Sequence, residues 1–207
     1  MNDQSIGGWL DELASSAPAP GGGAAAALET AMAAALVEMF CNLTIGKPAY
    51  VEHEATMTSV RDRATELRAE ALLLAAEDAA AFRAVIDAYR LPREPESEAE
   101  MRRQRIQGAL AGAADVPRRT AAKATEILDL TETVVPLGNL NVISDAAAAA
   151  GVARAALQTA LLNIDANRAL IEDPVLGAEL AAITAEIEQQ LRRADRIVEA
   201  VRARAAG

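Results

Sequence analysis

The stretch Pro18-Ala19-Pro20-Gly21-Gly22-Gly23-Ala24-Ala25-Ala26-Ala27-Leu28 decides how the chain begins to fold. Its two prolines favour an extended approach, and its three glycines allow a sharp turn and close contact with another group. The alanines that follow start a helix, whose first N–H groups have no partner within the helix. The turn is therefore suited to seat an anionic or carbonyl oxygen. The alternative is a tight loop whose glycines only let two helices pack closely, because the stretch is neither a P-loop nor a dinucleotide fingerprint.

The composition of the 207-residue chain is that of an all-α protein. Apolar residues make up 52% of it and aromatic residues only 2%, and alanine dominates. Alanine favours helices and disfavours strands. No linker is long enough to separate two domains, so residues 1–207 are predicted to form a single helical domain.

Apolar periodicity and helix-breaking residues predict a bundle of about seven helices, some of them broken. Ser5 is expected to cap a short first helix, and Asp173 to cap the last one. Pro117 is expected to begin a new helix and so to separate the fourth from the fifth. After the short first helix, the predicted helices cover about residues 22–43, 51–89, 97–115, 117–132, 142–170 and 174–204.

Charge and residue counts exclude several classes of function. The formal net charge of −10 disfavours binding to nucleic acid or to an anionic membrane surface. The chain has one cysteine, Cys41, and one histidine, His53, and no ligands at metal-binding spacing, so no metal site is predicted. The most apolar segment, 24–43, contains two glutamates and is mostly alanine, which favours a buried helix over a membrane span. The start of the chain has no signal-type segment, and we expect a cytoplasmic protein.

Asp78 is the first candidate for chemistry. It is the one charged residue in the apolar seam of the helix predicted over 51–89. A carboxylate on a packing seam must be paired, hydrogen-bonded or protonated, and burial raises its pKa. Such a group suits a general acid or base. The alternative is a structural carboxylate that caps or pairs with a neighbouring helix.

A second candidate is the segment Gly138-Asn139-Leu140-Asn141-Val142-Ile143-Ser144-Asp145. Two amides, a hydroxyl and a carboxylate meet there at the start of a predicted helix. Capping by Asn141 or Ser144, with Asp145 in the first turn, would account for part of this pattern. Capping needs one such residue, and the surplus favours a binding or catalytic site.

Lys47 is the third candidate. It lies in a Gly-Lys-Pro turn close in sequence to Tyr50, where it could neutralise a substrate carboxylate or polarise a leaving group. The alternative is an ordinary solvated lysine.

Taken together, these segments resemble the cyclodeaminase/cyclohydrolase family, whose domain is fused behind formiminotransferase in a bifunctional folate enzyme and also occurs alone in bacteria. The resemblance runs from about Ser5 to Asn167, and its motifs stand in order along the chain. The matching segments are Trp9–Ala14 with Pro18–Gly23, Leu43–Tyr50, Asp78–Phe82 with Tyr89–Pro92, Val116-Pro117, and Gly138–Asp145.

The resemblance implies a helical homodimer with a folate site in a groove at or near the dimer contact. It implies ring closure of 5-formiminotetrahydrofolate with loss of ammonia, giving 5,10-methenyltetrahydrofolate and serving histidine degradation. The alternative within the family is a methenyltetrahydrofolate cyclohydrolase. Both reactions pass through a tetrahedral carbon that bridges N5 and N10, and both need a proton to move on or off nitrogen or water. Neither requires a cofactor beyond the tetrahydrofolate substrate, which can be polyglutamylated.

By the same resemblance, Asp78 and Asp145 would handle protons in one shared cavity, and Lys47 with Tyr50 would engage the folate. Asn139, Asn141 and Ser144 would hydrogen-bond the substrate, and the backbone of Gly21, Gly22 and Gly23 would let it approach closely. Three positions depart from the family pattern, which often has serine at Ala24, a basic residue at Pro48 and lysine at Arg93. A non-catalytic folate-binding protein and a purely structural helical dimer therefore remain alternatives.

Overall fold

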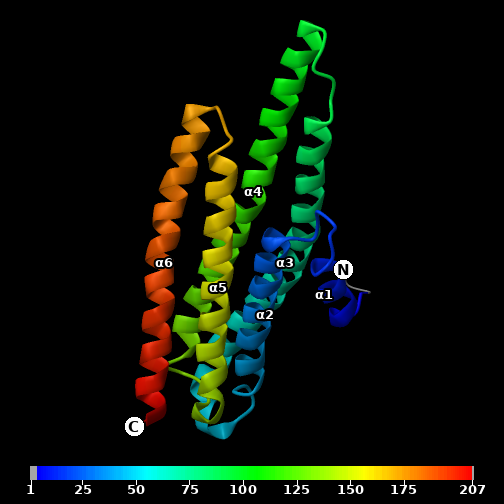
Figure 1. The fold of residues 1–207 in the computed structure, drawn as a ribbon. Helices are drawn as coiled ribbons and strands as arrows, with labels where there is room; N and C mark the ends of the chain where they lie inside the picture. The colour runs from blue at the N-terminus through cyan, green and yellow to red at the C-terminus, as the bar shows by residue number, and fades with distance from the viewer. Residues whose placement is uncertain (1–3, 207) are drawn as a thin grey trace.

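The computed structural model describes residues 4–206 as an all-helical bundle (Figure 1). The all-α prediction is confirmed. Within the described residues there are six α-helices rather than seven, joined in part by two short 3-10 helices. The elements are α1 (Ile6–Leu13), α2 (Gly22–Asn42), a 3-10 helix (Pro48–His53), α3 (Glu54–Tyr89), α4 (Glu96–Val134), a second 3-10 helix (Leu140–Val142), α5 (Ile143–Arg168) and α6 (Pro174–Ala206).

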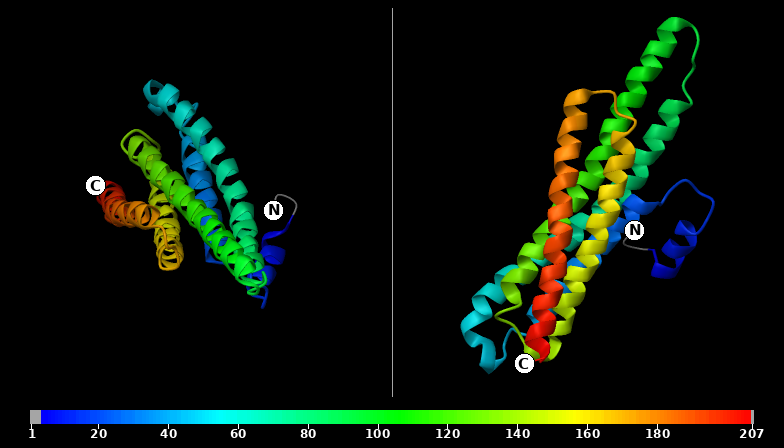
Figure 2. Two further views of the ribbon diagram at one scale, coloured as in Figure 1. Left: turned by 90° about the horizontal axis from the view of Figure 1, so that it is seen from above. Right: turned by 60° about the vertical axis from the view of Figure 1, so that its left-hand side comes forward.

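Helix α2 lies between α3 and α5 (Figures 1 and 2). Helix α4 packs against α3 and α5, and α6 covers the outer side of α5. The tip of the α3–α4 hairpin projects beyond the other helices. The α2 helix and the segment Leu140–Arg168 are long and apolar enough to cross a membrane, but both pack against other helices here, as core helices do.

Small side chains let these helices approach closely. The main core is built from alanines of α2 and α5, with larger residues such as Phe40, Met57 and Leu128 filling the space between them. A second cluster, around the buried Trp9, fixes α1 against α2 and α3. The seam predicted for α3 is confirmed, since most of its apolar members are buried and Asp78 is half-buried.

The predicted helix break at Pro117 is wrong. Residues 96–134 form one continuous helix, α4, with Pro117 inside it and buried. A proline at this position leaves the carbonyl of Ala113 without its helical partner. The side-chain Nδ2 of Asn167 on α5 donates to that carbonyl at 3.5 Å. The partner helix therefore supplies the missing donor, which explains how α4 continues through the proline.

The two helix caps predicted from sequence are confirmed. The Ser5 Oγ accepts a hydrogen bond from the N–H of Gly8 at 3.1 Å, and the Asp173 Oδ1 accepts one from Val175 at 2.9 Å. The predicted start of the long helix at Val51 is too early, because Pro48–His53 forms a 3-10 turn and α3 begins at Glu54.

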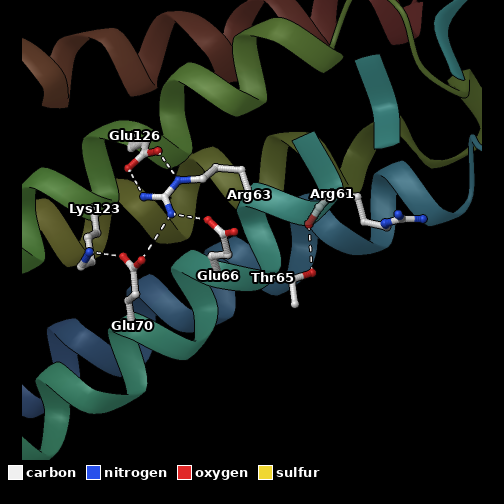
Figure 3. Close-up of polar contacts among 7 residues, drawn as sticks. All are labelled: Arg61, Arg63, Thr65, Glu66, Glu70, Lys123 and Glu126. Carbon is white, nitrogen blue, oxygen red and sulfur yellow. Dashed lines mark hydrogen bonds and ion pairs between the residues drawn. The ribbon is translucent and has the colours of Figure 1, made fainter. Parts of the chain in front are cut away.

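An ionic network joins α3 to α4 on the outside of the bundle (Figure 3). Arg63 donates to both carboxylate oxygens of Glu126, at 2.6 and 2.9 Å, and to Glu66 at 2.7 Å. Lys123 pairs with Glu70, which also contacts Arg63. These charges satisfy one another, so the network fixes how α3 and α4 lie against each other and leaves no free group for chemistry.

Candidate active site

Asp78 lies where α3 crosses the start of α2. Gly21, the N-cap of α2, has no side chain to accept the free N–H groups of the helix. The Asp78 carboxylate takes that role, accepting a hydrogen bond from the backbone N–H of Ala24. Gly23 has to be glycine, because any Cβ at that position would overlap the Asp78 carboxylate. The glycine-rich turn is therefore both a close-packing loop and a seat for an anionic oxygen.

Two opposing effects act on the Asp78 carboxyl. Burial raises its pKa above the usual aspartate range, while the hydrogen bond from Ala24 lowers it, and burial is the larger effect. Asp78 thus caps α2, as the structural alternative predicted, but its pKa stays above that of an ordinary aspartate. A carboxyl with a raised pKa holds its proton more readily than an ordinary aspartate, which is a property of many general acids and bases.

A small cavity of about 210 Å³ opens beside Asp78. Gly21, Gly22 and Gly23 form one wall, and Asn163 and Asn167 of α5 form another. The Nδ2 groups of both asparagines donate to backbone carbonyls, those of Thr159 and Asn163. Neither Oδ1 accepts a hydrogen bond from the described residues, so both remain available to a ligand donor. The cavity has room for part of a drug-sized ligand only.

Asn139 lies at the other end of α2 and has a structural role. It is 1% exposed, its Nδ2 donates to the carbonyl of Leu43 at 2.9 Å, and its Oδ1 accepts from the N–H of Asn141 at 3.1 Å. Its backbone N–H donates to Thr44 Oγ1. Gly138 beside it has to be glycine, since a Cβ would overlap Phe40. These bonds use the Asn139 side chain to join two loops, so its proposed hydrogen bond to substrate is not supported.

The other predicted residues of this end are more open. Lys47, Asn141 and Ser144 are exposed, and Asp145 and Tyr50 are half-buried. The Tyr50 hydroxyl accepts a hydrogen bond from the N–H of Leu140 at 3.3 Å and keeps its own proton to donate. These five residues lie in the loops and the helix start at this end of α2, and we call them the Lys47 group.

The structure separates Asp78 from the Lys47 group within one chain. Asp78 contacts the first residues of α2, whereas Thr44, just beyond the last residue of α2, contacts Asn139. The 21 residues of α2 span about 30 Å. The predicted cavity shared by Asp78 and Asp145 is therefore not formed within a single chain, because the two aspartates lie at opposite ends of this helix.

Sequence reasoning missed one polar residue of α2. Glu29 is half-buried, and its Oε2 has no hydrogen-bond partner among the described residues. The sequence signal for it is a lone acid in an alanine-rich segment, a pattern that also disfavours a membrane span.

Known proteins with similar sequences place the chain in a family. Residues 5–192 match the sequence model described as formiminotransferase-cyclodeaminase. The chain belongs to the formiminotransferase-cyclodeaminase family. It is 46% identical over 177 residues to a methenyltetrahydrofolate cyclohydrolase of Methylorubrum extorquens, and the match covers 86% of this chain and 85% of that protein.

More distant members of this family carry the other activity in their names. The formimidoyltransferase-cyclodeaminase of Mus musculus is 29% identical, and the match covers 84% of this chain but only 32% of that longer protein. The crystal structure of a formiminotetrahydrofolate cyclodeaminase from Thermotoga maritima matches with a TM-score of 0.85 at 29% identity, covering 97% of this chain and 98% of that one. The family resemblance stated from the motifs is thereby confirmed.

Of the three departures from the family pattern, Ala24 lies at the candidate site. Its side chain is fully buried and only its backbone N–H reaches Asp78. A serine there is therefore not needed to hold the aspartate. Pro48 begins the 3-10 turn that follows Lys47.

Proposed function

We propose that this protein is a methenyltetrahydrofolate cyclohydrolase that converts 5,10-methenyltetrahydrofolate and water to 10-formyltetrahydrofolate. The observation that carries the proposal is the 46% identity to a protein of that name, along nearly the full length of both. The matches to proteins named for cyclodeaminase activity are weaker, at 29% identity. We also propose that the enzyme acts in the cytoplasm.

Asp78 has the properties that the reaction requires. Water adds to the methenyl carbon, which lies between N5 and N10 and carries positive charge. Asp78 takes a proton from the attacking water, and a carboxylate also favours the cationic substrate. When the bond from this carbon to N5 breaks, Asp78 returns the proton to N5. The hydroxyl of the tetrahedral carbon releases its own proton to the solvent as the formyl carbonyl forms. A carboxyl with a raised pKa suits both steps without a metal or a histidine.

An absorbance assay tests the proposal. Methenyltetrahydrofolate has an absorbance that disappears as the ring opens, so hydrolysis is followed directly above the spontaneous rate. We expect a protein-dependent decrease with methenyltetrahydrofolate and the reverse reaction with 10-formyltetrahydrofolate. Absence of any protein-dependent change with both substrates would refute the cyclohydrolase function.

Cyclodeaminase activity is the second candidate, favoured by the close fold match to a protein of that name. In that reaction N10 attacks the formimino carbon, and ammonia leaves after it receives a proton. Protonated Asp78 is suited to supply that proton. The same assay run with 5-formiminotetrahydrofolate distinguishes the two, since only a cyclodeaminase would form the methenyl absorbance and release ammonia.

A second copy of the chain would bring the two polar groups together. The exposed side of α2 carries two large apolar side chains, Met32 at 46% and Met39 at 47% exposure. A two-fold axis near Met32, the middle of α2, would pair two α2 helices in opposite directions. Each Asp78 would then face the partner's Lys47 group, and two sites would form per homodimer. The 210 Å³ cavity, too small for a whole folate, would be extended by that partner.

Replacing Met32 with lysine tests the dimer. Two lysines near the axis would repel each other and lose apolar burial, so we expect a monomer by analytical ultracentrifugation and loss of activity, with the helical circular dichroism unchanged. A monomeric Met32→Lys variant with wild-type activity would refute the shared site without affecting the proposed reaction.

A further inference from the structure

Glu29 is the polar group of α2 that neither the fold nor the proposed chemistry uses. Its Oε2 is buried, and no hydrogen-bond donor in residues 4–206 contacts it. Glu38 on the same helix differs, because Arg68 of α3 donates to it at 3.0 Å. A buried carboxylate oxygen without a donor costs free energy, so its presence in an alanine-rich helix needs an explanation.

The position of Glu29 relates it to the cavity beside Asp78. Glu29 follows Gly22 by seven residues, which is about two helical turns, so both lie on the same side of α2 and about 10 Å apart. A Cβ on Gly22 would lie 3.5 Å from Nδ2 of Asn163, which shows that this side of α2 faces α5. Glu29 therefore lies on the side of α2 that faces α5, about two helical turns from the cavity.

The neighbouring part of α5 offers no partner for Glu29. Helices α2 and α5 run in opposite directions, since Gly22 approaches Asn163 and Thr44 contacts Asn139. This register places Glu29 beside the turn of α5 around 152–156, where the residues are valine and alanine apart from Arg154. Arg154 is paired with Asp195 of α6 at 2.8 Å. Burial also raises the pKa of the Glu29 carboxyl, as expected for an acid without a compensating charge.

We propose that Glu29 is a substrate-binding residue that accepts hydrogen bonds from the 2-amino group and the N3–H of the pterin ring. This inference rests on the proposed folate function. The two oxygens of a carboxylate match two parallel N–H donors, as in its pairing with arginine. In the proposed complex the bicyclic ring would span the axial separation of about 10 Å between Glu29 and Gly22. The ring's amino edge then points to Glu29 while the reacting carbon lies at Asp78.

The test compares wild type with Glu29→Gln on two substrates. One is methenyltetrahydrofolate, and the other is its analogue with a 2-methyl group in place of the 2-amino group. Glutamine keeps the size of the side chain but presents an N–H₂ to the pterin donors. We expect KM for the natural substrate to rise about 10- to 100-fold with kcat changed less than about threefold, because a charge-assisted bond is lost in both ground and transition states. Wild type should prefer the 2-amino substrate, and the variant should lose this preference.

Binding of tetrahydrofolate measured by calorimetry separates this inference from the proposed function, because it requires no turnover. Weaker binding by Glu29→Gln supports the inference even if wild type hydrolyses neither substrate. The inference would be overturned if wild type and variant bound tetrahydrofolate with equal affinity, or if the variant kept the preference between the two substrates. It would also be overturned if the variant changed only the oligomeric state of the protein. Glu188→Gln, on the exposed side of α6, is the matched control and should behave as wild type.

Discussion

The two ends of α2 carry similar kinds of residue but use them differently. At its start, Asp78 accepts one backbone hydrogen bond and faces a cavity, and the Oδ1 atoms of two asparagines stay open within the described residues. At its end, both polar atoms of the Asn139 side chain are hydrogen-bonded to the backbone, and the residue joins two loops. A polar cluster next to a glycine turn is thus no guide to function by itself, and what distinguishes a site is hydrogen-bonding capacity left unused.

Replacing Asp78 should give the largest effect. Asp78→Asn keeps the shape and the hydrogen bond from Ala24 but cannot take up the proton, so we expect kcat to fall about 10²- to 10⁴-fold. The helical circular dichroism should be unchanged. Asp87→Asn, on the exposed side of the same helix, is the control and should keep wild-type turnover. Wild-type turnover by Asp78→Asn would remove this end of α2 from the chemistry.

Replacing Asn139 should affect stability and not turnover. Asn139→Ala leaves the Leu43 carbonyl and the Asn141 N–H without partners, which should lower the free energy of unfolding by about 1–3 kcal/mol. Urea denaturation measures this, with Asn42→Ala, an exposed site at the end of α2, as the control. If Asn139→Ala were fully stable but inactive, the distinction between the two ends would be wrong.

A double-mutant cycle tests the contact between Asn167 and the proline in α4. Asn167→Leu frees the Ala113 carbonyl and should cost about 1 kcal/mol, since its hydrogen bond is long at 3.5 Å. In a Pro117→Ala background the new N–H can serve that carbonyl, so the same change should cost less. Equal costs in both backgrounds would show that Asn167 does not compensate for the proline.

The smallest expected effect is the pH dependence of stability at Asp78. Its pKa is raised in the folded protein, so the carboxyl favours folding when protonated. The stability of wild type relative to Asp78→Asn should be highest below the ordinary aspartate pKa of 3.8 and should decrease as pH rises through the raised folded value. Chemical denaturation at a series of pH values measures it, and a difference that grows with pH would contradict the raised pKa.

Local sequence signals predicted much of the fold. The caps at Ser5 and Asp173 and the apolar seam of α3 depend on residues close in sequence. The continuation of α4 through Pro117 did not follow from the sequence, because the compensating donor is Asn167, 50 residues away on another helix.

The candidate site was predictable only in part. Asp78 was found because it interrupts an apolar seam, and its contact with the glycine turn could not be foreseen without the packing of α2 on α3. The prediction that Asp145 shares a cavity with Asp78 was wrong within a single chain. The sequence does not show that the two aspartates lie near opposite ends of α2. Glu29 was overlooked since a lone acid in an alanine helix shows its missing partner only in three dimensions.

Mixing two inactive variants tests most directly whether the two ends of α2 meet across a dimer. Asp78→Asn and Lys47→Ala are each expected to lose activity. The first changes the residue at the start of α2, and the second changes the residue at its end. After subunit exchange, half of the dimers should be mixed and one of their two sites should be intact, so about a quarter of wild-type activity should return. No recovery despite demonstrated exchange would contradict a site built from both ends of α2.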